Sequence, residues 1–239
     1  MPTPQHTDYS TVILPTPVTA EILQRVLYVR YEGSPYDSGS AFTLDTQQHQ
    51  YIVTATHVVH GIKQEDTIEV FFQGGFRHIP TTVTLADTRT DVTVLRLSSR
   101  ITPSMPVVAD HDGLYLAQDV YFLGFPYSMV NLSYFQADAR PFPFVKKGII
   151  SQMERGADGK YEFFVDAHNN PGFSGGPLIF RNLSTGQVAV AGVVTDRLTR
   201  EQPVHEKGRL SPYVTEENIG ILLARDIAYA VEALDTGAL

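Results

Sequence analysis

The sequence predicts an all-β protein with a single α-helix near its C-terminal end. The chain has 239 residues, 43% of them hydrophobic and 18% charged, so it is long and apolar enough to form a stable core. It also contains 18 glycines and 15 prolines, a composition typical of short strands joined by many turns. Short apolar or alternating runs occur in two series of roughly six, which indicates two β-barrels or a β-sandwich.

The first series of strands follows residues 1–20, which are rich in proline and threonine and are expected to form an irregular arm. Each run spans about 5–9 residues and is bounded by turn residues. The strands are expected at residues 23–31, 40–44, 51–55, 67–72, 81–85 and 92–97. Residues 98–112 are polar and contain proline, so we expect them to connect the two halves.

The second series of strands fills most of the remaining chain. Its strands are expected at residues 119–125, 145–152, 161–165, 177–180, 188–194 and 219–224. Residues 196–218 are polar and charged and are expected to form a long exposed loop. Residues 226–234 carry apolar side chains at helical spacing and predict the helix, with Asp226 as its N-cap.

Composition excludes several classes of function. The chain has 18 basic and 26 acidic residues and no basic cluster, which argues against nucleic-acid binding. The absence of cysteine excludes disulfides, thiolate zinc sites and a thiol nucleophile. No signal peptide is visible and no apolar run approaches the ~20 residues that span a bilayer. We therefore expect a cytoplasmic protein with no membrane partner.

The segment around Ser174 is the first candidate for catalytic chemistry. Three glycines flank the serine: Gly172, Gly175 and Gly176. Such a turn lets a substrate approach closely and can aim consecutive amide N–H groups at an oxyanion, although a purely structural turn is the alternative. The G-x-S-x-G elbow of α/β-hydrolases is disfavoured, because Pro177 begins an expected strand and the one downstream histidine, His205, lies in the polar segment.

His57 and Asp91 are the other two candidates. His57 ends an apolar run, where it could be a buried structural histidine, and a metal pair with His60 lacks further ligands at matching spacing. Asp91 opens the expected strand 92–97 and has Asp87 as a nearby rival. The combination of the three segments favours catalysis over three separate structural roles.

These segments resemble the motifs of the chymotrypsin-fold, or trypsin-like, serine peptidases, and most of all those of the bacterial HtrA/Deg branch. The family's T-A-x-H motif corresponds to T-A-T-H at residues 54–57. Its D-[IV]-A-[VL]-L motif corresponds to D-V-T-V-L at residues 91–95, with threonine in place of alanine, and its G-[DN]-S-G-G-P motif to G-F-S-G-G-P at residues 172–177. Weaker matches extend the resemblance from about residue 39 to residue 234 in the order of the family. Because the sequence ends shortly after the expected helix, we expect none of the PDZ modules that regulate HtrA-type enzymes.

The resemblance implies two six-stranded antiparallel β-barrels with the active site between them. The first barrel would span residues 21–105 and carry His57 and Asp91. The second would span residues 106–225 and carry Ser174, followed by the helix and tail of residues 226–239. Ser174 would be the nucleophile, His57 the base and Asp91 the residue that orients the imidazole.

The resemblance also implies an oxyanion hole and a substrate pocket. The oxyanion hole would lie at Gly172, Phe173 and Ser174, with the amides of Gly172 and Ser174 as donors. The pocket would involve His168, Val194 and Thr195, and the Thr195 hydroxyl would also support the triad aspartate. His168 does not supply the carboxylate that cleavage after arginine or lysine requires. We therefore expect cleavage after small or medium apolar residues ahead of cleavage after acidic ones.

Phe173 departs from the family pattern, which has aspartate or asparagine at that position. A liberated N-terminal amine therefore has no carboxylate to pair with, and activation by maturation is not expected. We expect a serine endopeptidase that forms an acyl-enzyme on a protein or peptide substrate, uses no cofactor or metal, and could take a regulatory protein partner. The alternative is a catalytically silent or partner-activated fold that serves as a binding module, and esterase action by the same triad is a third reading.

Overall fold

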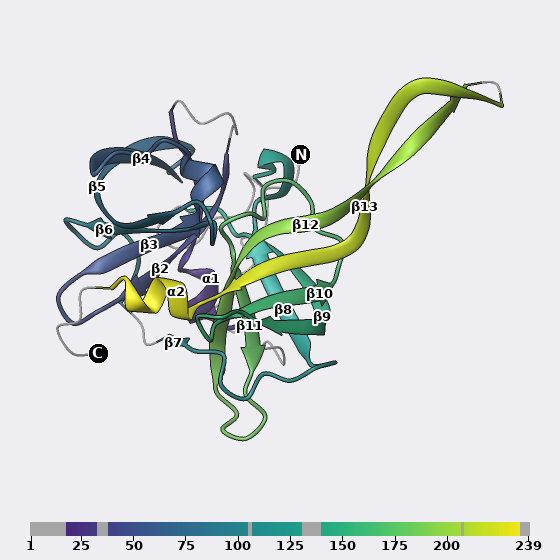
Figure 1. Ribbon diagram of the computed structural model, residues 1–239. Coiled ribbons are helices and arrows are strands. Elements are labelled where there is room, and N and C mark those ends of the chain that lie inside the picture. The colour runs from purple at the N-terminus through teal and green to yellow at the C-terminus, as the bar shows by residue number, and fades with distance from the viewer. Residues whose placement is uncertain (1–17, 33–37, 105–106, 131–139, 207, 235–239) are drawn as a thin grey trace, which may run out of the picture.

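The computed structural model describes residues 18–32, 38–104, 107–130, 140–206 and 208–234. Most of the expected N-terminal arm, and residues 235–239 of the expected tail, lie outside these described residues. Strands dominate the described residues, as predicted, and they form two sheets that lie against each other (Figure 1). Within the described part of the chain, no helix is long and apolar enough to cross a membrane.

The first sheet is a closed antiparallel barrel in the order β1-β2-β3-β6-β5-β4. Its strands are β1 (Val26–Arg30), β2 (Gly39–Asp45), β3 (Gln50–Ala55), β4 (Glu65–Phe72), β5 (Gly75–Asp87) and β6 (Val92–Leu97). The first strand starts later than expected because Thr19 caps a single helical turn, α1 (Ala20–Leu23), by accepting a hydrogen bond from the Ile22 amide. The barrel interior holds buried aliphatic side chains such as Leu27, Ile52 and Leu95.

The second sheet contains seven strands in the order β11-β8-β9-β10-β13-β12-β7. They are β7 (Val108–Ala109), β8 (Asp119–Gly124), β9 (Phe144–Arg155), β10 (Tyr161–Asp166), β11 (Pro177–Arg181), β12 (Val188–Glu206) and β13 (Arg209–Asp226). Because β11 also pairs with β12, six of the strands form a second ring. The sequence did not predict β7, a two-residue strand that pairs in parallel with the start of β12.

The expectation of an exposed loop at residues 196–218 is wrong. The outer parts of β12 and β13 pair with each other and form a two-stranded ribbon that projects from the molecule (Figure 1). The pairing of Thr199 with Asn218 and of Gln202 with Thr215 defines its register. Side chains on both faces of the ribbon are largely exposed, so the segment lacks the alternation of apolar and polar residues by which buried strands are recognised.

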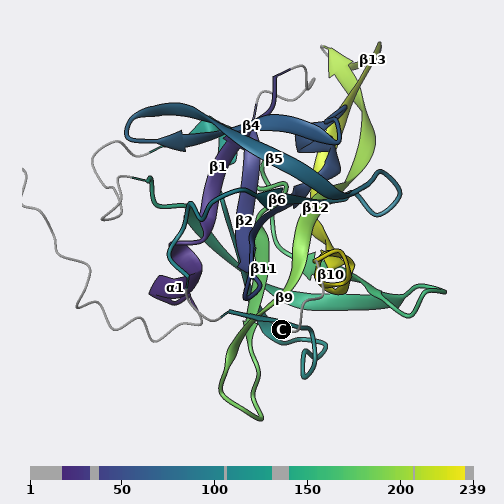
Figure 2. The same cartoon turned by 90° about the vertical axis from the view of Figure 1, so that its left-hand side faces the viewer.

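A shared apolar cluster joins the two barrels. It contains Phe42 and Val53 from the first barrel and Leu123, Ile179 and Val193 from the second, all buried. The short C-terminal helix α2 (Ala228–Glu232) adds Ala230 to the same cluster. Figure 2 shows α2 as a compact turn of helix at the end of β13. The cluster fixes the first barrel against the second, so side chains at their junction keep constant relative positions.

The helix is shorter than the expected residues 226–234, and its N-cap position is Ile227 rather than Asp226. Asp226 still serves the end of the helix, because its Oδ1 accepts the Ala228 amide at 3.0 Å. The same carboxylate is fully buried and accepts the Tyr161 amide at 3.0 Å through Oδ2. Asp226 therefore ties the helix to β10 as well as to its own strand.

Candidate active site

His57 and Asp91 meet at one end of the first barrel. β3 ends at Ala55 and continues into a 3-10 turn, Thr56–Val59, that carries His57. The Asp91 carboxylate lies 2.7 Å from His57 Nδ1 through Oδ2 and accepts the His57 backbone N–H at 2.9 Å through Oδ1. The Asp91 carbonyl accepts the Thr56 amide at 3.1 Å. With Nδ1–H directed at the carboxylate, Nε2 is the ring nitrogen that can take up a proton.

Asp91 adopts φ +56°, a left-handed conformation that aspartate tolerates better than most residues. This conformation turns the carboxylate back onto the histidine. The side chains of His57 and Asp91 are 27% and 23% exposed, so the pair lies at the wall of an open site and Asp91 is less buried than the triad analogy implied.

The rival carboxylate, Asp87, does not contact His57. It accepts the Arg89 amide at 2.8 Å and forms an ion pair with the Arg89 side chain at 3.3 Å. Its carbonyl accepts the Thr56 hydroxyl at 3.1 Å, and that hydroxyl also accepts a hydrogen bond from Thr93 at 2.9 Å. The structure thus places Asp87 behind the histidine turn as a structural residue.

Ser174 stands on a turn that requires glycine on both sides. Gly172 has φ +102°, and a Cβ there would lie 2.3 Å from the Phe125 carbonyl oxygen. Gly175 has φ +83°, and a Cβ there would lie 2.0 Å from the Ser40 carbonyl oxygen. Both distances are far below van der Waals contact, so only glycine allows this turn to lie so close to Phe125, just after β8, and to Ser40 on β2.

Two backbone amides beside Ser174 are free to bind an anion. Among the described residues, no hydrogen-bond acceptor lies within reach of the Gly172 or Ser174 N–H. The Pro171 carbonyl accepts the Tyr127 amide at 2.8 Å, and since a trans peptide directs its C=O and N–H oppositely, the Gly172 N–H is directed away from Tyr127. The Phe173 amide differs from these two, because it donates a hydrogen bond to the Asn170 carbonyl at 3.3 Å.

Phe173 is fully buried, and its ring meets that of Phe122 edge-on at a centroid distance of 5.0 Å. The residue that departs from the family motif therefore anchors the nucleophile turn by packing into the second barrel. Aromatic packing of this kind contributes on the order of 1 kcal/mol beyond its burial.

Ser40 is a residue of the candidate site that sequence reasoning missed. Its hydroxyl donates to the Gly172 carbonyl at 2.6 Å and accepts the Phe125 amide at 2.9 Å. Its own amide donates to the Ser174 carbonyl at 2.8 Å. Ser40 lies on β2 of the first barrel, so it connects the nucleophile turn of one barrel to the other. A serine at the start of a strand carries no sequence signal for such a role.

Two of the expected pocket residues lie behind Ser174. The Val194 side chain is fully buried in the core of the second barrel, and its backbone bonds both glycines that follow Ser174. Thr195 contributes its carbonyl, which accepts the Ser174 hydroxyl at 3.3 Å. Within the described residues, both hydrogen bonds of the Asp91 carboxylate are with His57, and none joins it to the Thr195 hydroxyl from which support was expected.

His168 does border a cavity beside the nucleophile turn. The cavity has a volume of about 150 Å³ and is bounded by the turn on one side and the base of the ribbon on the other. Its lining residues are Tyr127, His168, Asn169, Asn170, Pro171, Arg197, Thr199, Glu216 and Asn218. The ribbon residues in this set were assigned to a loop by the sequence, so their place in the wall could not be foreseen.

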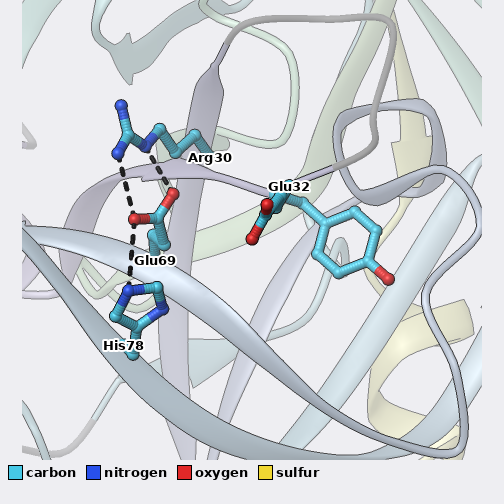
Figure 3. Close-up of a pocket in the computed structure, with 5 residues that line it drawn as sticks. Arg30, Glu32, Glu69 and His78 are labelled. Atoms are coloured by element: carbon cyan, nitrogen blue, oxygen red, sulfur yellow. Dashed lines mark hydrogen bonds and ion pairs between the residues drawn. The ribbon is translucent and has the colours of Figure 1, made fainter.

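A larger cavity, of about 400 Å³, lies on the outside of the first barrel. Figure 3 shows the Glu69 carboxylate between the Arg30 guanidinium and the His78 ring, at 2.5 Å and 3.7 Å. The hydrogen bond from Arg30 lowers the pKa of Glu69, so the carboxylate is held as an ion-pair partner. No serine lines this cavity, and the described residues contain no group of side chains suited to hold a metal ion.

Comparison with known proteins gives the family of the chain. The chain is 33% identical over 143 residues to a probable periplasmic serine endoprotease, DegP-like, from Halomonas elongata, which covers 59% of this chain and 26% of that protein. It also superposes on the crystal structure of the serine endoprotease from Yersinia pestis with a TM-score of 0.55 and 22% identity, over 89% of this chain and 62% of the other. The chain thus spans less than two thirds of either relative. The trypsin-like peptidase domain profile matches residues 39–191, and the chain belongs to that family.

Proposed function

We propose that the chain is a serine endopeptidase in which Ser174, His57 and Asp91 form the catalytic triad. Two observations carry the proposal: Asp91 orients His57 in the first barrel, and the turn around Ser174, which Ser40 hydrogen-bonds to that barrel, presents two backbone amides that donate no hydrogen bond within the described residues. In this scheme His57 Nε2 removes the Ser174 proton as Oγ attacks the substrate carbonyl. The serine Oγ–carbon bond forms while the carbonyl π electrons move onto its oxygen.

The developing oxyanion would be bound by the Gly172 and Ser174 amides, each worth roughly 3–4 kcal/mol in comparable sites. The protonated imidazole then donates its proton to the leaving amine, and the peptide C–N bond breaks. Water then attacks the acyl carbon as Nε2 takes its proton, and the imidazolium returns that proton to Oγ as the Oγ–carbon bond breaks and the carboxylic acid product leaves. Asp91 stays ionised throughout and stabilises the imidazolium.

One contact must change before this reaction. The Ser174 hydroxyl donates to the Thr195 carbonyl at 3.3 Å, and a rotation about its Cα–Cβ bond is needed to direct its proton at His57. Side-chain rotations of this kind take nanoseconds or less, so they do not limit turnover. The same contact supports a second candidate, a latent fold that awaits substrate or a partner protein.

The test is digestion of an unfolded protein such as casein, with mass spectrometry of the products. We expect internal cleavage by the wild-type chain and none by Ser174→Ala or His57→Ala, whose side chains can change without loss of folding. Products trimmed only from the ends would contradict the endopeptidase proposal. Release of acyl groups from esters without any peptide cleavage would favour the esterase reading.

A further inference from the structure

Lys146 lies beneath the nucleophile turn and takes no part in the triad. It is on β9, directly opposite Phe122 of β8. Its ammonium lies over two aromatic faces, 5.8 Å from the ring centroid of Phe122 and 5.7 Å from that of Phe173. These distances are within the range of a cation–π interaction.

The same ammonium binds the segment that leads into the turn. Lys146 Nζ donates to the His168 carbonyl and, at 3.1 Å, to the Asn170 side-chain oxygen. Asn170 in turn supplies the carbonyl that accepts the Phe173 amide at 3.3 Å. One cation therefore contacts the start of the turn through hydrogen bonds and its end through the Phe173 ring.

No carboxylate balances this charge in the part of the chain that the structure describes. Lys147, the next residue, points to the other side of β9 and pairs with Asp119 at 2.8 Å. Lys146 is partly buried, and burial lowers its pKa. The loop acceptors and ring faces are thus what stabilises the ammonium, and the ammonium loses them if the turn moves away.

Phe173 anchors the end of the turn by packing, and Lys146 adds hydrogen bonds at its start. The Gly172 amide can receive an oxyanion only if the peptide that carries it keeps its direction. A shift of about 1 Å in a catalytic group can cost roughly 100-fold in rate.

We propose that Lys146 is a positioning residue that holds residues 168–173, and with them the Gly172 amide, in the geometry that receives the oxyanion. The inference rests on the proposed peptidase function and adds a residue to it. Lys146 acts through hydrogen bonds to the loop and does not touch the substrate.

The test compares Lys146→Met with Lys146→Arg and uses Lys147→Met as the matched control. We expect Lys146→Met to lower kcat for peptide hydrolysis by about tenfold to 100-fold with KM changed less than threefold. Lys146→Arg keeps the charge and can donate to both acceptors, so it should restore most of kcat. Lys147→Met should match the wild type. An unchanged kcat in Lys146→Met, or a loss that arginine does not restore, would overturn the proposal.

The decrease of kcat at alkaline pH distinguishes the proposed role of Lys146 from a role in packing alone, because packing would not make kcat depend on the charge of residue 146. Wild-type kcat should fall as Lys146 loses its proton, below the pH at which an ordinary lysine does so, whereas Lys146→Arg should keep its activity to higher pH. The titratable side chains adjoining its contacts are His168, whose carbonyl it binds, and Lys147, which pairs with Asp119 on the far side of β9. Identical alkaline limbs would overturn the proposal.

Amide hydrogen exchange separates this inference from the proposed function. Should the wild type cleave no peptide, the proposed function fails, yet the ordering of the turn can still be measured. The Phe173 and Gly176 amides, both hydrogen-bonded within the turn, should exchange faster in Lys146→Met than in the wild type. Equal exchange would show that Lys146 does not order the turn.

Discussion

Asp91 accepts two hydrogen bonds from the same residue, and this makes the effect of Asp91→Asn predictable. The His57 backbone N–H is a fixed donor, so the asparagine oxygen must stay on it and the new NH2 group faces Nδ1. Nδ1 then has to act as an acceptor, which puts the imidazole proton on Nε2, where it blocks uptake of the serine proton. We expect turnover to fall by roughly 10⁴-fold.

The fold of Asp91→Asn should be unchanged, because asparagine also tolerates φ +56°. Asp87→Asn is the control, since its side chain contacts Arg89 and not the histidine. Steady-state kinetics with circular dichroism of each variant checks both points. A larger loss of turnover in Asp87→Asn than in Asp91→Asn would mean that the wrong carboxylate has been placed in the triad.

At the level of single residues, the sequence predicted the features that lie within short motifs. The proximity of His57 to Asp91 was predicted correctly, and so was the glycine-bounded turn of Ser174. Ser40 and Lys146 were missed because their roles depend on contacts with residues more than 20 positions away along the chain. Motifs record short stretches of sequence, whereas these roles arise from how distant strands pack.

At the level of elements, the ribbon of β12 and β13 is the clearest difference between sequence and structure. Strands buried on one face are recognisable from apolar alternation, and β6 was predicted at its observed bounds. The ribbon buries neither face, so cross-strand pairs such as Arg200 with Glu217, at 2.9 Å, support it instead. A sequence reading based on burial cannot find such a strand.

The ribbon should be dispensable for folding. Its outer residues pair only with each other, so residues 202–215 can be replaced by Asn-Gly, a two-residue turn that joins Glu201 to its partner Glu216. We expect the melting temperature to change by less than about 4 °C, which corresponds to roughly 1 kcal/mol or less for a chain of this size. Differential scanning calorimetry checks this. A loss of cooperative unfolding would show that the ribbon is part of the core fold.

The stability that the contact between His111, before β8, and Asp226, at the end of β13, contributes should depend on pH. His111 Nδ1 lies 2.9 Å from the buried Asp226 carboxylate. That hydrogen bond raises the pKa of His111, burial partly opposes the rise, and the charges of Asp226, Asp110 and Asp112 add to it. The folded-state pKa therefore lies above the unfolded value of about 6.5, so the stabilisation is complete below pH ~6.5 and is lost as pH rises through the folded-state pKa.

Urea unfolding of the wild type and His111→Asn at several pH values measures this link. The free energy of unfolding should be lower in the variant than in the wild type, with the largest difference near pH 5.5. This difference should shrink as pH rises to about 9. A difference that grows with pH would mean that His111 is favoured in its neutral form in the folded protein.

At the level of the whole molecule, the packing of two barrels brings the site together. His57 and Asp91 come from the first barrel and Ser174 from the second, and the shared apolar cluster and Ser40 hold these surfaces in contact. The family resemblance predicted a chymotrypsin-like fold, and the closed six-stranded barrel and second sheet confirm that prediction. The cytoplasmic location, the domain boundaries and a regulatory partner stay predictions.

The account's central claim is that this junction makes Ser174 a reactive nucleophile activated by His57. Its most direct measurement is labelling of the full chain with a fluorophosphonate probe, followed by intact-mass analysis and peptide mapping of the adduct. We predict a single adduct on Ser174 in the wild type, no adduct in Ser174→Ala, and labelling of His57→Ala slowed by at least about 100-fold. An unlabelled wild type, or an adduct formed equally fast without His57, would contradict the claim.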